Sequence, residues 1–212
     1  MRVITISREF GSGGRELGKR LADELGFAYY DKEITAQIAK EVAMDEEYVE
    51  HMLSRGIPHS FGITYANSFG YPSYVQQDAT KLLLAQQKIL KQVALEGNCV
   101  IVGQSANAIL EDIHSFDIFV YASTFSKVER CLKRANPEEN LDEAKVKKML
   151  KQIDKTRAKQ HELHSDIKWG SKEGYHLCIN TTNVEIKKIV PVLASYIKEW
   201  FKEKFKVGDD YV

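Results

Sequence analysis

Cysteine is scarce in this sequence of 212 residues, and its pattern excludes several classes of protein. The three cysteines, Cys99, Cys131 and Cys178, are widely spaced and form no C-x-x-C pair. An odd number without paired spacing argues against a disulfide framework or a structural zinc site. Cys99 and Cys178 lie beside apolar, strand-like runs, which favours buried free thiols in a reducing compartment. We therefore expect a cytoplasmic protein.

Long apolar runs and an excess of one charge are also missing. No stretch approaches the roughly 18 apolar residues that a membrane span needs. The N-terminus turns polar at Arg8 before any signal-peptide core could form. Thirty basic residues balance thirty acidic ones, whereas a nucleic-acid-binding protein usually shows a basic excess. Neither a membrane nor a nucleic acid is therefore expected as a partner.

What the sequence does contain is an alternation of short β-rich runs with longer amphipathic stretches. Hydrophobic residues make up 43% and charged residues 28%, which is typical of a globular protein. Strands are predicted at residues 3–7, 27–30, 100–102, 116–121 and 175–180. Helices are predicted at residues 14–25, 32–43, 74–96, 105–111, 125–134 and 184–205. This order predicts a doubly wound α/β fold, with ligands beyond the carboxyl ends of the strands.

Two segments interrupt the alternation. Residues from about 46 to 73 carry His51, several aromatic residues and turn-forming glycines, and predict an inserted helix and loop. Residues 136–172 are rich in Lys and Glu, with helical periodicity from Leu141 to Ile153. Without an internal repeat or a low-complexity linker, the sequence is interpreted as one domain over residues 1–212 with two insertions.

A glycine-rich loop follows the first strand. Gly11, Gly13 and Gly14 allow positive φ and a close approach of backbone N–H groups to an anion, with Ser12 between them. The next helix directs its positive dipole end to the same place, and Arg15 adds a charge suited to phosphate. A simple tight turn is the alternative interpretation. The P-loop pattern G-x-x-x-x-G-K-[ST] is matched imperfectly, because Arg8, Gly14-Arg15 and Glu16 replace its glycine, lysine and hydroxyl.

Glu16 has two interpretations. As an acidic residue in the first helical turn it favours the helix dipole. Alternatively, its carboxylate could bind Mg²⁺ in place of the usual hydroxyl, because hard cations prefer oxygen ligands. Both remain open at this point.

Beyond these features, the sequence resembles the cytidylate kinase-like proteins, relatives of bacterial cytidylate kinase, over nearly its full length. The resemblance is carried by ITISREFGSGGRELG (residues 4–18) and YYDKE (29–33), and by CVIVG (99–103), DKTR (154–157) and LCINTT (177–182) in the same order. The first two in tandem are fairly specific for this group.

The resemblance implies a P-loop NTPase-type fold with a five-stranded parallel sheet and helical acceptor-binding and lid insertions. It also implies a kinase that uses ATP and Mg²⁺ and transfers the γ-phosphoryl group to a nucleoside monophosphate such as CMP. The donor phosphates would be held by Gly11, Ser12, Gly13, Gly14, Arg15 and Glu16. The acceptor site would include Asp31, Gly103 and Gln104, and the lid Asp154 and Arg157. Catalytic charge would come from Arg15, Arg130, Arg134 and Arg157.

The sequence departs from the family pattern at positions that matter for turnover. Gln104 stands where these kinases carry an arginine that meets the acceptor, and Leu150-Lys151 replaces an Arg-Asp pair. Because phosphoryl transfer depends on positioning and charge neutralisation, a nucleotide-binding regulatory protein without turnover is the second hypothesis. The sequence leaves the oligomeric state and the acceptor undetermined.

Overall fold

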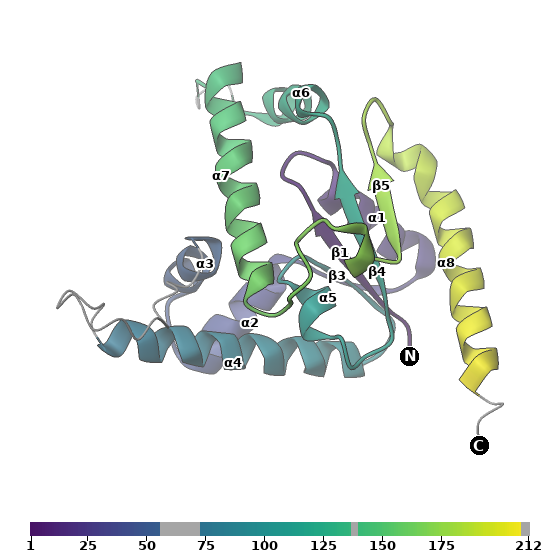
Figure 1. Cartoon of the computed structure of the whole chain (residues 1–212), viewed down its shortest axis with the longest axis horizontal. Coiled ribbons are helices and arrows are strands. Elements are labelled where there is room, and N and C mark those ends of the chain that lie inside the picture. Colours follow the sequence, from purple (N-terminus) through teal and green to yellow (C-terminus); the bar gives the residue numbers. More distant parts are fainter. Residues whose placement is uncertain (56–72, 137–139, 209–212) are drawn as a thin grey trace.

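A computed structural model describes residues 1–55, 73–136 and 140–208 of the chain (Figure 1). The strands are β1 (Val3–Arg8), β2 (Ala28–Tyr30), β3 (Cys99–Val102), β4 (Ser115–Tyr121) and β5 (Leu177–Asn180). The helices are α1 (Gly14–Leu25), α2 (Lys32–Val42), α3 (Glu46–Arg55), α4 (Ser73–Leu95), α5 (Ala106–Ile109), α6 (Thr124–Arg134), α7 (Glu143–Glu162) and α8 (Ile186–Gly208), with a 3₁₀ turn η2 at Lys172–Gly174.

These strands form a parallel sheet of five within the described residues, in the order β2-β3-β1-β4-β5. β1 lies at the centre and is buried along nearly its whole length. Its register places Ile6 beside Val102 of β3 and Ile118 of β4. Since all strands run in one direction, the segments that follow β1, β2, β3 and β4 meet at one edge of the sheet.

The two faces of the sheet bury alternate residues of each strand, as the pleat requires. Ile4, Ile6 and Val100 pack with α1 and α8 on one face, whereas Val3 and Ile101 pack with α2 and α4 on the other. Figure 1 shows α8 along one side of the molecule and α4 across another, with α7 standing beside α6. Both faces are therefore covered by helices, which explains the mostly apolar strands.

The doubly wound fold is confirmed, and the predicted strands and helices are present with small shifts at their ends. The predicted helix at 105–111 is wrong in length, because α5 spans only Ala106–Ile109. Gln104 and Ser105 adopt positive φ before it, and Leu110 ends it. The segment 46–73 begins with α3, but the aromatic residues Phe61, Tyr65, Phe69 and Tyr71 lie outside the described residues. The segment 136–172 contains α7, which buries Val146 and Leu150.

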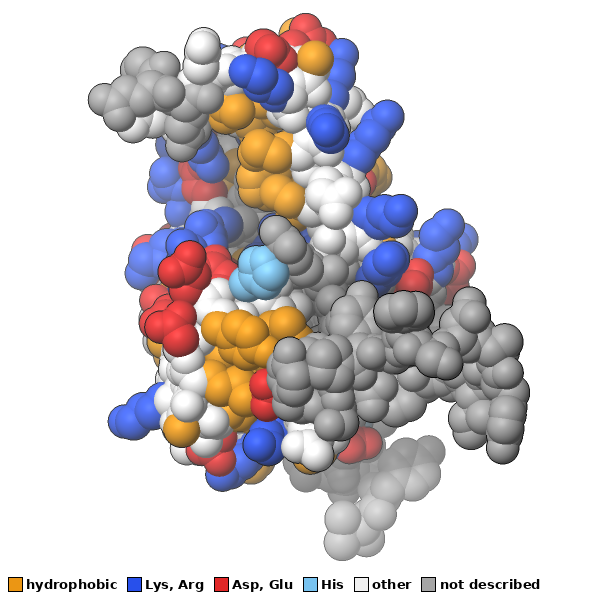
Figure 2. Space-filling model, turned by 90° about the vertical axis from the view of Figure 1, so that its left-hand side faces the viewer, with side chains coloured by type: hydrophobic (Ala, Val, Ile, Leu, Met, Phe, Trp, Pro, Cys, Tyr) orange, Lys and Arg blue, Asp and Glu red, His pale blue; other side chains and the backbone are white. Residues whose placement is uncertain are grey.

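In the described part of the chain, no helix combines the length and the apolar character needed to cross a membrane. The face of the molecule seen in Figure 2 carries basic and acidic side chains in mixture, with small hydrophobic patches between them.

Burial on α4 generates a prediction about stability. Leu82 of α4 is fully buried in the core cluster that contains Ile34 and Ile38 of α2, whereas Leu84 on the same helix is 62% exposed. Leu82→Ala should lower the free energy of unfolding by about 2–5 kcal/mol, because it removes buried methyl groups and leaves a cavity. Leu84→Ala is the matched control and should change it by less than about 0.5 kcal/mol. Urea denaturation measures both, and equal effects would contradict the packing of α4.

Candidate functional site

The glycine-rich loop joins the end of β1 to the start of α1. Gly11 and Gly13 have φ of 76° and 86°, so both require the left-handed region that glycine tolerates. Gly13 is the N-cap of α1, and no side chain caps the helix. The first backbone N–H groups of α1 are therefore left for a ligand, as in other anion-binding helix starts. The positive φ predicted for the loop is thus confirmed at Gly11 and Gly13, whereas the prediction is wrong for Gly14, which is already the first residue of α1.

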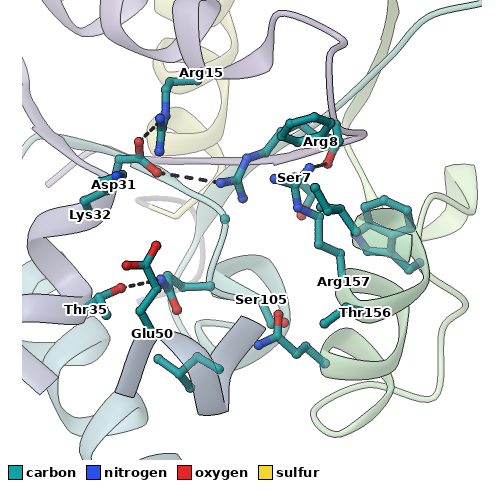
Figure 3. A pocket seen from close by; sticks show the side chains of 17 residues that line it. Ser7, Arg8, Arg15, Asp31, Lys32, Thr35, Glu50, Ser105, Thr156 and Arg157 are labelled. Carbon is teal, nitrogen blue, oxygen red and sulfur yellow. Dashed lines mark hydrogen bonds and ion pairs between the residues drawn. The ribbon is translucent and has the colours of Figure 1, made fainter. Parts of the chain in front are cut away.

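A cavity of about 420 Å³, here called the loop cavity, opens beside these groups. Its lining includes Gly11, Gly13, Gly14, Arg130, Arg134 and Met149. A second cavity of about 290 Å³, the Asp31 cavity, lies next to it and is lined by Asp31, Lys32, Thr35, Gln104, Ser105 and Trp169, among others (Figure 3). Arg8, Phe10, Arg15 and Arg157 line both cavities, so the two spaces meet at three guanidinium groups.

Ser12 and Arg130 hold the loop rather than face the cavity with free donors. The Ser12 hydroxyl donates to Glu9 O at 2.8 Å. The backbone carbonyl oxygen of Ser12 accepts from Thr181 Oγ1 at 2.6 Å and from Arg130 Nη1 at 3.2 Å. The other Arg130 donor nitrogen bonds to the carbonyls of Thr181 and Val184. Arg130 therefore braces the loop against the segment after β5, although it also lines the loop cavity.

Helix α7 is fastened to the same loop by two residues predicted for the lid. Phe10 N donates to Asp154 Oδ1 at 2.7 Å, and Arg157 Nη1 donates to Arg8 O at 2.9 Å. Lys127 of α6 lies between Glu9 and Asp154, at 2.9 Å and 3.6 Å. These contacts bring the end of β1, α6 and α7 together, and they place Asp154 and Arg157, the residues assigned to a lid, against the loop.

The predicted acceptor residues also lie at the carboxyl edge of the sheet. Asp31 follows β2 and pairs with Arg15 at 2.5 Å and with Arg8 at 3.6 Å, as Figure 3 shows. Gln104 follows β3, donates to Thr35 Oγ1 at 3.2 Å and accepts from Gln86 Nε2 at 2.9 Å. Its side-chain amide is therefore held in one orientation at the wall of the Asp31 cavity.

Arg8 is the functional candidate that the sequence analysis did not select. Its side chain is 16% exposed and points from the end of β1 toward Asp31 (Figure 3). The sequence did contain a signal, because an arginine stands where the P-loop pattern has its first glycine, and a glycine stands where it has lysine. Without the tertiary structure, that exchange was interpreted only as a departure from the motif.

The three guanidiniums at this junction are poorly balanced by negative charge. Burial lowers the pKa of Arg157 to about 9, and the charge of Arg8 acts in the same direction. Burial also lowers the pKa of Arg8, although Asp31 opposes this effect. Two carboxylates face these three guanidiniums: Asp31 pairs with Arg8 and Arg15, and Asp154 lies 3.8 Å from Arg157 but is shared with Lys127. An anionic ligand placed between them would relieve this imbalance.

The carboxylates near the loop do not form a ready site for Mg²⁺. Glu16 accepts from Arg20 at 2.9 Å and from Arg134 at 2.5 Å, so both of its oxygens are paired. Glu9, Asp31 and Asp154 are likewise paired with basic side chains. Within the described ranges, no group of three His, Cys, Asp or Glu side chains could hold a metal ion. The residues present therefore do not fit a protein-held Mg²⁺ at Glu16.

Comparison with known proteins gives a family match and a set of similar structures. The cytidylate kinase-like family profile matches residues 3–183. An uncharacterized protein from Eubacterium ventriosum is 26% identical, with a TM-score of 0.67 and coverage of 93% of this chain and 99% of that one. Shikimate kinase from Bacteroides thetaiotaomicron is 14% identical, with a TM-score of 0.56 and coverage of 93% and 98%.

A third similar structure, shikimate kinase from Acinetobacter baumannii in complex with shikimate, is 13% identical with a TM-score of 0.51 and covers 94% of each chain. At these identities the two shikimate kinases support the fold alone. No curated protein matches the chain significantly.

His161, near the end of α7, generates a pH-dependent prediction for the helix that carries Arg157. The residue is 2% exposed, and burial lowers its pKa. The native state therefore binds fewer protons than the unfolded state, whose histidines titrate near about 6.5. The stability contributed by neutral His161 is present above that pH and declines as the pH falls below it.

His161→Phe should consequently lose less stability than the wild type between pH 7 and pH 5.5. The measurement is urea denaturation at several pH values. His114→Gln, at an exposed position, is the control and should keep the wild-type pH dependence. A His161→Phe curve parallel to the wild type would contradict the role of His161.

Proposed function

Because the chain belongs to the cytidylate kinase-like family, we propose that it transfers the γ-phosphoryl group of ATP to the phosphate of a nucleoside monophosphate, with CMP as the model acceptor. The loop cavity takes the phosphates of ATP, and the Asp31 cavity takes the acceptor. Both the fold and the family are those of kinases, which supports phosphoryl transfer as the reaction class.

One observation carries this proposal: the loop cavity and the Asp31 cavity meet at Arg8, Arg15 and Arg157. A donor phosphate on the amides of α1 and an acceptor phosphate beside Asp31 would both adjoin these guanidiniums. In phosphoryl transfer, little covalent chemistry is left to the protein, and catalysis consists of alignment and charge neutralisation. The largely buried guanidiniums of Arg8 and Arg157 and the more exposed one of Arg15, all between the two cavities, supply both.

The reaction needs no general base. The bond between the γ-phosphorus and the bridging oxygen of ATP breaks, and ADP leaves with the electron pair. A new bond forms between that phosphorus and an oxygen of the acceptor phosphate, which is already ionised at neutral pH. Arg8, Arg15 and Arg157 would stabilise the negative charge on the transferring group. Mg²⁺ would be bound mainly by the phosphates of ATP, because Glu16 is paired with two arginines.

The polar lining of the Asp31 cavity supports a small acceptor with several hydrogen-bonding groups. Lys32, Thr35 and Ser105 line it together with Gln104, and Trp169 adds an aromatic wall. A base and a ribose present groups of this kind. The lack of an arginine at position 104 indicates that Arg8 or Arg15, rather than residue 104, holds the acceptor phosphate.

The altered loop favours one alternative, a regulatory protein that binds nucleotide without turnover. Gly14 occupies the position of the lysine that acts on the phosphates in the P-loop pattern. The two functions differ in a simple observable, since only the enzyme converts ATP to ADP in an acceptor-dependent way. ATP binding without any such conversion would favour the regulatory protein.

A coupled ADP-release assay with ATP, Mg²⁺ and a panel of monophosphates tests the proposal. We expect turnover with at least one pyrimidine monophosphate. Arg157→Met should lower kcat on the order of 10²- to 10³-fold, because it removes a charge from the transferring phosphoryl group. Lys159→Met, an exposed position two residues further along α7, should leave kcat unchanged. An Arg157→Met enzyme with wild-type kcat would contradict the assigned role.

A further inference from the structure

Arg8 and Gly14 occupy positions that cannot both carry a side chain. A Cβ added at Gly14 would lie 2.6 Å from Arg8 Cβ and 3.0 Å from Arg8 Cγ. Both neighbours belong to the stem of Arg8, next to the backbone, and cannot move aside as a flexible chain end could. Gly14 is the first residue of α1 and does not have positive φ. Space for Arg8, and not backbone conformation, therefore requires glycine at position 14.

A second glycine makes room for the other end of the same side chain. A Cβ at Gly103 would overlap Arg8 Nη1 and lie 2.6 Å from Arg8 Cζ. Gly103 follows β3, so the Arg8 side chain passes between the start of α1 and the turn after β3. The guanidinium at its end lies at the junction of the loop cavity and the Asp31 cavity. At Gly103 the close atoms are the flexible end of Arg8, and its φ of 83° already favours glycine, so only Gly14 is required by the space that Arg8 takes.

The P-loop pattern has the opposite arrangement at the same two positions. Its first glycine corresponds to Arg8, and its lysine, six residues later, corresponds to Gly14. In that pattern the lysine reaches the phosphates from the first turn of the helix. We propose that this chain has exchanged the two residues, so that Arg8 delivers the phosphate-binding charge from the end of β1 in place of a lysine on α1.

The exchange determines which phosphates the Arg8 guanidinium can contact. Arg8 has a planar, multidentate donor group, and it lines both cavities. It is therefore placed to bind the terminal phosphate of a polyphosphate in the loop cavity and an acceptor phosphate in the Asp31 cavity. The Asp31 carboxylate pairs with Arg8 and Arg15, so an anionic ligand would share these guanidiniums with it.

The exchange can be tested by binding, with no turnover needed. The probes are inorganic tripolyphosphate and Mg·ATP, titrated calorimetrically into the full chain. Arg8→Gly should weaken both by roughly 10- to 100-fold, because it removes a charge-assisted contact. The double variant R8G/G14K moves the charge to α1 and should recover at least about tenfold of that loss by the same kind of contact. Arg2→Met, at the opposite end of β1, is the control and should bind like the wild type.

The steric conflict between Arg8 and a side chain at position 14 is measured separately, by the midpoint of thermal unfolding. Gly14→Ala should lower the midpoint while Arg8 is present and should lower it less in the R8G background, where Val120 Cβ at 3.3 Å is the remaining close neighbour. Equal effects in the two backgrounds would show that Gly14 does not serve Arg8. A folded R8G variant with wild-type affinity would overturn the proposal, as would an R8G/G14K variant that fails to fold or binds no better than R8G.

This inference rests on the proposed function only in taking a polyphosphate as the ligand, and the two can fail separately. If the wild-type protein binds neither tripolyphosphate nor Mg·ATP, both are wrong. If the wild type binds them and R8G binds equally well, the exchange alone is wrong. If binding depends on Arg8 but no monophosphate is phosphorylated, the exchange stands and the enzyme activity is wrong.

Discussion

An imbalance of charge at the carboxyl edge of the sheet is the constraint on which the candidate site depends. Arg8, Arg15 and Arg157 meet there, and Asp31 is the carboxylate that pairs with the first two. Burying like charges together is costly unless an anion offsets them. Burial, together with the neighbouring charge of Arg8, lowers the pKa of Arg157 to about 9. A phosphate ligand is therefore the natural complement of the site, whichever reaction follows.

The rest of the site keeps these charges in place. Asp154 and Lys127 join α7 and α6 to the loop, and Arg130 joins the loop to the segment after β5. Several basic residues that sequence reasoning assigned to catalysis are thus divided between two tasks. Arg15 and Arg157 line the junction of the two cavities. Arg130 instead donates hydrogen bonds to backbone carbonyl oxygens, and Arg134 pairs with Glu16. Charge alone did not distinguish these roles, because hydrogen-bond partners depend on the folded neighbours.

Much of the fold could be predicted because its signals are local. Apolar runs such as residues 100–102 predicted buried parallel strands, and the glycines after β1 predicted a loop with positive φ, as observed at Gly11 and Gly13. The assignment of Asp31 and Gly103 to an acceptor site and of Asp154 to a lid followed from resemblance to a family. The short α5 was mispredicted, since positive φ at Gln104 and Ser105 delays its start.

The sequence by itself determined the parallel α/β architecture and the loop amides at the first helix, because periodicity and glycine placement act within a few residues. Only the tertiary structure decided the meaning of Arg8 and Gly14. Their coupling depends on a 2.6 Å separation between Arg8 Cβ and the Cβ position of residue 14, which exists only after β1 and α1 pack together. A steric conflict between residues of two different elements produces no periodic pattern in the sequence, so it can be recognised only in the folded structure.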